Sequence, residues 1–186
     1  MSAIHRPRHH YRFDEYLALC RDSTVRLEFW SGQIYAMAGG SIEHSRLSLR
    51  IGSLLDQRRQ TGCTALESNT RIRPLTSDRA TYADAVLVCG EYEYHPADPE
   101  RRTIANPTVV VEVLSESTAE DDQTDKFDHY RLAPSLTDYV LIWQDDQRVE
   151  VRSRQADGWL VKTFTTGETV ELRSGMRFAV DELYAR

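Results

Sequence analysis

Two runs of aliphatic residues constrain this sequence more than any other feature: TYADAVLVC at 81–89 and PTVVVEVL at 107–114. Apolar residues occupy both alternating sets of positions in each run, whereas a strand with one face in water alternates apolar and polar residues. A strand of this composition needs a covering layer on each of its faces. We therefore expect an α/β fold in which helices flank a mixed β-sheet.

The remaining pattern predicts which segments supply the covering helices and the other strands. Two alternating segments flank Ser31-Gly32, which is typical of a β-hairpin, and Ser41 and Thr118 are suitable N-cap residues. Hydrophobic periodicity predicts helices over 13–20, 41–60 and 118–133, and further strands over 64–73, 138–143, 148–153 and 159–164. We expect a loose N-terminal segment at 1–12 and a single domain at 13–186, which opens with the short helix and the hairpin.

Charge and composition argue against several classes of protein. The chain has 29 acidic and 23 basic residues and a formal net charge of −6, which argues against a protein that coats nucleic acid through a basic surface. A nuclease is compatible with this charge, because a metal ion in an acidic site can bind phosphate. No apolar run approaches the ~18 residues of a membrane span, and no signal-peptide core is present, so we expect a cytoplasmic protein without membrane contact.

The cysteines do not predict a structural role. Cys20, Cys63 and Cys89 are odd in number, and no two of them have the spacing of metal ligands. We therefore expect neither a disulfide framework nor a zinc site.

Two carboxylates interrupt the apolar runs, Asp84 in the first and Glu112 in the second. An ionised carboxylate inside such a strand costs several kcal/mol unless it is paired, hydrogen-bonded or metal-bound. If the two strands are neighbours, a divalent cation shared by both acids removes their repulsion, and oxygen ligands suit Mg²⁺ or Mn²⁺. The alternative is that each acid forms a buried salt bridge, with Arg71 or Arg73 as a candidate partner.

Lysine is rare in this chain, and Lys126 and Lys162 are the only two among the 23 basic residues. Lys126 lies on the predicted helix that follows the Glu112 strand, so its amine could reach back over the end of the sheet. There it could stabilise the negative charge of a phosphorane or orient an attacking water. The alternative is a solvent-facing lysine paired with Asp122 one turn earlier.

Five segments, taken in order, resemble the Uma-type family of restriction-endonuclease-like proteins, which belongs to the PD-(D/E)xK phosphodiesterase superfamily. They are LEFWSGQIYAMAGGSIEHS, TYADAVLVCG, NPTVVVEVLSEST, DKFDHYRLAPSLTDYVLI and VEVRSR. The resemblance implies the restriction-endonuclease-like fold, whose core is a helix, a three-strand meander, a second helix and a further strand. It also implies metal-dependent hydrolysis of phosphodiester bonds in DNA.

The same resemblance implies roles for individual residues. In the usual motif a lysine follows the acid by two positions, which is Leu114 here, and in this family the lysine moves to the next helix, where Lys126 matches it. Ala83 stands where the family usually has proline, a change that removes no ligand. The implied ligands of Mg²⁺ or Mn²⁺ are Asp84, Glu112 and the backbone carbonyl of Val113.

Glu28 and His44 also match the family pattern and are auxiliary candidates. Glu28 could add an acid to the metal site, or it could be a cross-strand partner of Arg26 or Gln33. His44 could assist in the site, or it could be a structural histidine on the core side of its helix.

The sequence therefore predicts a Mg²⁺-dependent DNA endonuclease with Asp84, Glu112 and Lys126 as catalytic residues. Cutting both strands of a duplex calls for two sites, which makes a homodimer a candidate assembly. The alternative is a catalytically silent protein of the same fold that binds DNA or protein. The acidic charge and the lack of a DNA-reading motif favour that alternative.

Overall fold

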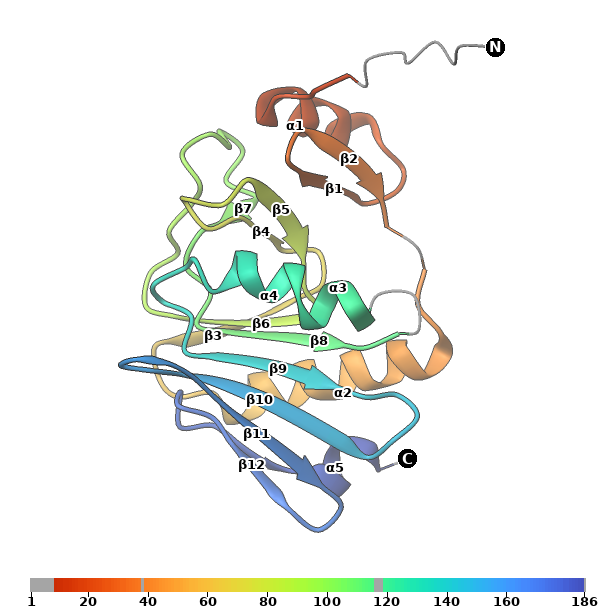
Figure 1. Ribbon diagram of the computed structural model, residues 1–186, viewed down its shortest axis with the longest axis vertical. Helices are drawn as coiled ribbons and strands as arrows, with labels where there is room; N and C mark the ends of the chain where they lie inside the picture. Colours follow the sequence, from red (N-terminus) through yellow and green to blue (C-terminus); the bar gives the residue numbers. More distant parts are fainter. Residues whose placement is uncertain (1–8, 38, 116–118, 186) are drawn as a thin grey trace.

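The computed structural model describes residues 9–37, 39–115 and 119–185, and Figure 1 shows how their helices and strands are arranged. The helices are α1 (Phe13–Asp22), α2 (Ile42–Arg58), α3 (Ala119–Gln123), α4 (Asp125–Tyr130) and α5 (Val180–Tyr184). The strands are β1 (Leu27–Trp30), β2 (Gln33–Ala36), β3 (Cys63–Glu67), β4 (Arg71–Ile72), β5 (Arg79–Tyr82), β6 (Ala85–Cys89), β7 (Thr103–Ile104), β8 (Val109–Val113), β9 (Asp138–Ile142), β10 (Arg148–Gln155), β11 (Gly158–Thr165), β12 (Thr169–Glu171) and β13 (Arg177–Ala179). No helix of the described residues is long and apolar enough to cross a bilayer.

A six-stranded sheet in the order β11-β10-β9-β8-β6-β3 forms the centre of the fold. Strands β8 and β9 run parallel and the other neighbours antiparallel, so the sheet is mixed as predicted. The residues of β8 alternate between two cores: Val109 and Val111 face the side covered by α2 and α5, whereas Val110 faces the side covered by α4. The apolar character of both faces of this strand follows from its place between two helical layers.

The helix α1 and the hairpin β1–β2 form a separate layer at one end of the molecule, seen at the top of Figure 1. They pack around Phe13, Tyr16 and Phe29, and β1 joins a second sheet in the order β2-β1-β5-β4-β7. The predicted hairpin turn is confirmed, because Ser31 and Gly32 both have positive φ angles, 47° and 76°. A two-residue turn of this kind matches the twist of the strands that it joins.

The strands predicted as continuous over 64–73 and 81–89 are each broken in two, and here the prediction was wrong. The first run passes from β3 in the central sheet to β4 in the second sheet, and the second run returns from β5 in the second sheet to β6 in the central sheet. The second break falls at Ala83 and Asp84, between the end of β5 at Tyr82 and the start of β6 at Ala85. Asp84 therefore lies between two sheets and not within a strand.

The helix predicted over 118–133 is also interrupted. It consists of α3 and α4, which are separated at Thr124, whose backbone has φ −120° and ψ −85°. The regular helix ends at Tyr130, a short distance before Pro134. The predicted cap Thr118 and most of the predicted loose segment 1–12 lie outside the described residues.

The expectation that no disulfide forms was wrong, because Cys63 and Cys89 are joined by a disulfide. They face each other in the antiparallel register of β3 and β6, at the edge of the central sheet. The two cysteines are 26 residues apart in the chain, and this spacing does not predict that they pair. The register of β3 and β6 brings them together. Cys20 is a free thiol.

Candidate active site

A cavity of about 580 Å³ opens where the two sheets, α2 and the α3–α4 segment meet. Its lining residues lie between Arg26 and Lys126 in the chain and come from elements that include β1, β8 and the segment between β5 and β6. Every candidate residue identified from the sequence lines it: Glu28, His44, Asp84, Glu112, Val113 and Lys126.

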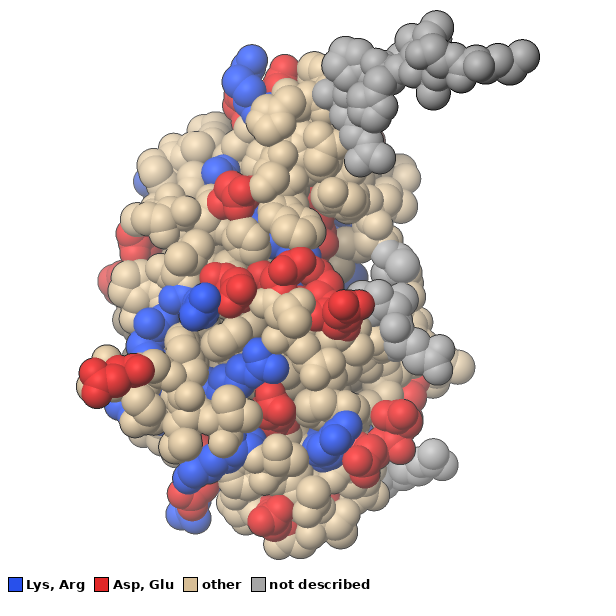
Figure 2. All heavy atoms as spheres, viewed as in Figure 1, with Lys and Arg blue, Asp and Glu red and all other residues tan. Residues whose placement is uncertain are grey.

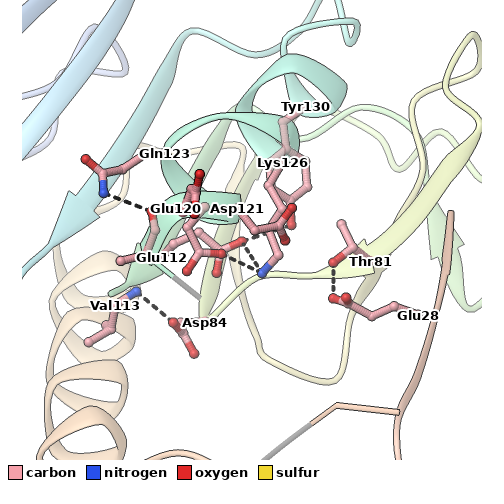
Figure 3. Close-up of polar contacts among 12 residues, drawn as sticks. Glu28, Thr81, Asp84, Glu112, Val113, Glu120, Asp121, Gln123, Lys126 and Tyr130 are labelled. Atoms are coloured by element: carbon pink, nitrogen blue, oxygen red, sulfur yellow. Dashed lines mark hydrogen bonds and ion pairs between the residues drawn. The ribbon is translucent and has the colours of Figure 1, made fainter. Parts of the chain in front are cut away.

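Glu112 is the most deeply buried acid of the cavity, with 3% of its surface exposed. Its side chain projects from β8 toward α4, where its Oε1 accepts a hydrogen bond from the Tyr130 hydroxyl at 3.1 Å and lies 3.4 Å from Lys126 Nζ (Figure 3). Burial raises the pKa of the Glu112 carboxyl well above its usual value, although the positive charge of Lys126 opposes this rise. A positive charge close to Glu112, such as that of Lys126, therefore favours the ionised form of this carboxyl.

Lys126 is a buried lysine, with 6% of its surface exposed. Its Nζ lies 2.8 Å from Asp122 Oδ1 and 3.4 Å from Glu112 Oε1. Burial alone would lower the pKa of the Lys126 amine, but the charges of Glu112 and Asp122 outweigh it and raise the pKa. The pairing with Asp122 is present as the alternative supposed, but the lysine faces the cavity and not the solvent.

Neither Arg71 nor Arg73 pairs with the two acids, so the partners named in the salt-bridge alternative were wrong. Glu112 is paired instead with Lys126, and Asp84 lies beside His44. Arg71 Nη1 lies 3.5 Å from Asp98 Oδ2, and the Arg73 guanidinium carbon lies 4.0 Å from the centre of the Phe13 ring. Both arginines stabilise the second sheet and its contact with α1.

Asp84 meets β8 because the strands β6 and β8 are antiparallel neighbours, as the metal hypothesis required. Its Oδ2 accepts a hydrogen bond from the Val113 backbone N–H at 2.7 Å, the contact drawn in Figure 3, and lies 3.2 Å from His44 Nε2. Ser41 caps α2 by accepting a hydrogen bond from the His44 N–H, which places this histidine in the first helical turn beside the cavity. The hydrogen bond to Asp84 raises the pKa of His44.

The hydrogen bonds to Glu112 and Asp84 leave one oxygen of each carboxylate without a donor among the described residues. Those to Glu112 reach Oε1, and that to Asp84 reaches Oδ2. Two carboxylate oxygens suit Mg²⁺ or Mn²⁺, which commonly keep water or substrate oxygens at their other positions. Within the described ranges no group of three or more His, Cys, Asp or Glu residues is arranged to hold a metal ion. Asp84 and Glu112 would supply two carboxylates to a cation, and water or substrate oxygens would have to supply most of its other ligands.

Glu28 lies on the wall of the same cavity but is held by different partners. Its Oε1 accepts a hydrogen bond from the Thr81 hydroxyl (Figure 3), and its Oε2 lies 3.8 Å from Arg79 Nη2. Arg26 and Gln33, the partners proposed from the sequence, instead donate hydrogen bonds to backbone carbonyls. No described hydrogen bond joins Glu28 to Asp84, Glu112 or Lys126, so its contribution to the site is its charge.

The sequence reasoning missed two residues of the site, Asp122 as a buried group and Tyr130 as a hydrogen-bond donor. Asp122 lies four residues before Lys126, and Tyr130 lies four residues after it. Side chains at this spacing share one face of a helix, so the spacing around a rare lysine was a usable signal. The break at Thr124 does not prevent the three side chains from converging near Glu112.

The site is acidic overall. The described residues that line the cavity include six carboxylic acids and three basic side chains, Arg26, His44 and Lys126. The acids are Glu28, Glu67, Asp84, Glu112, Asp121 and Asp122. A bare phosphate would be repelled from such a cavity, whereas a divalent cation would be attracted to it.

Comparisons with known proteins identify the family and the fold of this chain. The sequence model of the Uma2 family, described as "Putative restriction endonuclease", matches residues 13–181. Two uncharacterized proteins of Synechocystis sp. are similar to the chain: slr1290 is 34% identical over 178 residues, covering 92% of this chain and 90% of its own length, and sll1609 is 32% identical over 161 residues, covering 85% and 89%. The crystal structure of a "putative nuclease belonging to DUF820" from Anabaena variabilis superposes with a TM-score of 0.72 at 20% identity, covering 92% of this chain and 96% of the other. That structure has the same fold.

Proposed function

We propose that this chain, which belongs to the Uma2 family, is a metal-dependent endonuclease that hydrolyses phosphodiester bonds in DNA. The observation that carries the proposal is that Asp84, at the junction of β5 and β6, and Glu112, on β8, line one cavity together with the amine of Lys126. Family membership favours a nuclease over other metal hydrolases, and the fold of the Anabaena variabilis structure is consistent with it.

The arrangement of the acids supports Mg²⁺ or Mn²⁺ as the cofactor. Asp84 and Glu112 would hold the ion through the oxygens that lack a protein donor, and Val113 would add its backbone carbonyl. A bound divalent ion would supply a water of lowered pKa and stabilise charge on the phosphoryl oxygens. Acids outnumber basic side chains in the cavity lining, so the cavity has little positive charge to attract a phosphodiester. The cation would therefore be needed for substrate binding as well as for the chemical step.

Lys126 would act on the charge that develops during hydrolysis. Its amine is ionised, because Glu112 and Asp122 raise its pKa, and it lies at the cavity wall. A fixed positive charge in a partly dry site stabilises a developing oxyanion more strongly than it does in water. It could also orient the attacking water by donating a hydrogen bond to it. His44 is an auxiliary group that acts through its contact with Asp84.

Near-isosteric substitutions test the three catalytic assignments. We expect Asp84→Asn, Glu112→Gln and Lys126→Met each to slow the nicking of supercoiled plasmid in Mg²⁺ by at least about a hundredfold. Lys162→Met is the matched control, because Lys162 is the other lysine of the chain and is exposed on β11. Circular dichroism should show that all four variants fold. Undiminished nicking by any of the first three variants would refute its assignment.

A second candidate function is a catalytically silent member of the family that binds DNA or protein. The acidic cavity and the net charge of −6 favour it, because a nuclease without a basic groove has little long-range attraction for DNA. Calorimetric titration of the folded wild type with Mn²⁺ separates the two functions. Binding that Asp84→Asn abolishes supports the nuclease, and no binding supports the silent module.

A further inference from the structure

The phenol of Tyr130 contacts the same carboxylate oxygen as the proposed catalytic lysine. Its hydroxyl donates to Glu112 Oε1 at 3.1 Å, and Lys126 Nζ lies 3.4 Å from that oxygen. Both side chains come from α4, four residues apart, so one helix face presents an amine and a phenol to one oxygen. Figure 3 shows Tyr130 and Lys126 on α4 above Glu112.

The position of the Tyr130 hydroxyl is determined by the protein core. Tyr130 has 0% of its surface exposed, and its ring packs against Tyr139 with the ring centroids 5.8 Å apart. Among the described residues the hydroxyl makes no hydrogen bond other than the one to Glu112. A buried hydroxyl without a partner is costly, so this contact is strongly preferred over any rearrangement.

The two donors on Oε1 differ in how far they can move. A lysine side chain has four rotatable bonds and can follow a substrate or a cation. A tyrosine ring packed in a core has little freedom, because protein interiors are close-packed. Tyr130 is therefore the contact that restrains the plane of the Glu112 carboxylate, with one oxygen held at the phenol and the other turned away from it.

We propose that Tyr130 is a positioning residue that holds Oε1 of Glu112 so that Oε2 stays directed to the cation site. This inference rests on the proposed function, since it concerns the same metal site. Partners of this kind behind a metal ligand typically contribute about 10–100-fold to metal affinity. A tyrosine that only fills the core would contribute to stability and not to metal affinity.

The test compares two phenol deletions, Tyr130→Phe and Tyr184→Phe. Tyr184 is also buried, at 9% exposure, and its hydroxyl donates to the Trp143 carbonyl at 2.6 Å, in the core on the α2 and α5 side of the sheet. Mn²⁺ affinity is measured by calorimetry on the folded proteins, and stability by urea unfolding in EDTA. We expect both variants to be destabilised to a similar degree, but only Tyr130→Phe to bind Mn²⁺ about tenfold more weakly.

The outcomes separate this inference from the proposed function. Equal Mn²⁺ affinity in wild type and Tyr130→Phe overturns the positioning role and leaves the nuclease proposal standing. No Mn²⁺ binding by the wild type overturns both.

A measurement on the wild type covers the case in which Tyr130→Phe does not fold. The protein is labelled with ¹³C at the tyrosine ζ-carbons and titrated with Mg²⁺. We expect one buried tyrosine signal to shift, and not to shift in Glu112→Gln. If no tyrosine signal shifts, the positioning role is overturned.

Discussion

At the scale of single residues, the buried pair of Glu112 and Lys126 is the feature that most needs an explanation. Burial raises the pKa of the Glu112 carboxyl, and the positive charge of Lys126 opposes this rise. A buried ion pair adds little net stability, because desolvation costs about as much as the attraction returns. Its presence at a cavity wall is better explained by chemistry on a charged substrate than by stabilisation of the fold.

Outside the site, His95 provides a pH-dependent prediction. It is 7% exposed, its Nδ1 accepts a hydrogen bond from the Ala97 N–H at 3.2 Å, and burial together with the charge of Arg73 lowers its pKa. A lowered pKa means that the unfolded chain binds the proton more tightly, so His95 costs stability as the pH falls below about 6.5. We expect His95→Asn to lose less stability than the wild type between about pH 7 and pH 5.

Urea midpoints at the two pH values measure this difference. The substitution His9→Asn is the control for the removal of an exposed histidine. The raised pKa of His44 acts in the opposite direction, but it is common to all three proteins and cancels in the comparison. Parallel curves for wild type and His95→Asn would contradict the prediction.

At the scale of elements, the site is built by contacts between segments that are adjacent in space but separated in the chain. Strands β6 and β8 bring Asp84 beside Val113, and the broken helix α3–α4 brings Asp122, Lys126 and Tyr130 to Glu112. The break at Thr124 allows α3 and α4 to follow the sheet separately. Strand β8 therefore carries Glu112 and the junction of β5 and β6 carries Asp84, whereas a short helix carries the proposed lysine.

The disulfide between β3 and β6 gives a prediction for the sheet edge. Joining Cys63 to Cys89 closes a loop between residues 26 apart and should stabilise the fold by about 3 kcal/mol, because it restricts the unfolded chain. We expect Cys63→Ala to lower the free energy of unfolding by about this amount under oxidising conditions.

With a reductant present, wild type and Cys63→Ala should unfold at nearly the same urea concentration. Cys20→Ala is the control, because Cys20 is a free thiol and its loss should not depend on the redox conditions. A difference that persists in the reductant would mean that Cys63 acts through packing and not through the disulfide.

At the scale of the whole molecule, the charge distribution is unusual for a protein proposed to bind DNA. Acidic side chains gather over α3 on the face shown in Figure 2. The first turn of α3 carries three acids, of which Glu120 and Asp121 reach the surface and Asp122 is buried. Together with the acids of the cavity they produce a negative potential where a phosphodiester has to approach. DNA binding should therefore depend on a divalent cation.

This dependence can be measured by fluorescence anisotropy with the Lys126→Met variant, which should not cut the DNA. We expect binding to be at least about tenfold tighter in Ca²⁺ than in EDTA, because the cation reverses the local charge. Asp84→Asn in the same background should remove most of this gain. Equal affinities in Ca²⁺ and EDTA would contradict the prediction and favour the silent module.

The sequence by itself determined the layers of this protein and the residue types of its site. The apolar runs at 81–89 and 107–114 required cover on both faces, and the Ser31-Gly32 pair required a tight turn. Asp84, Glu112 and Lys126 stood out because charged residues are costly in apolar surroundings and lysine is rare in this chain. These are local properties, which a pattern of neighbouring residues can report.

Only the tertiary structure decided how those residues meet. It turned the chain between sheets at Asp84, placed Tyr130 and Asp122 around the Glu112–Lys126 pair, and paired Cys63 with Cys89. Strand register and crossings between sheets depend on contacts between residues far apart in the chain. Local periodicity does not predict the register or the crossings, because the same run of residues could form a strand in either sheet.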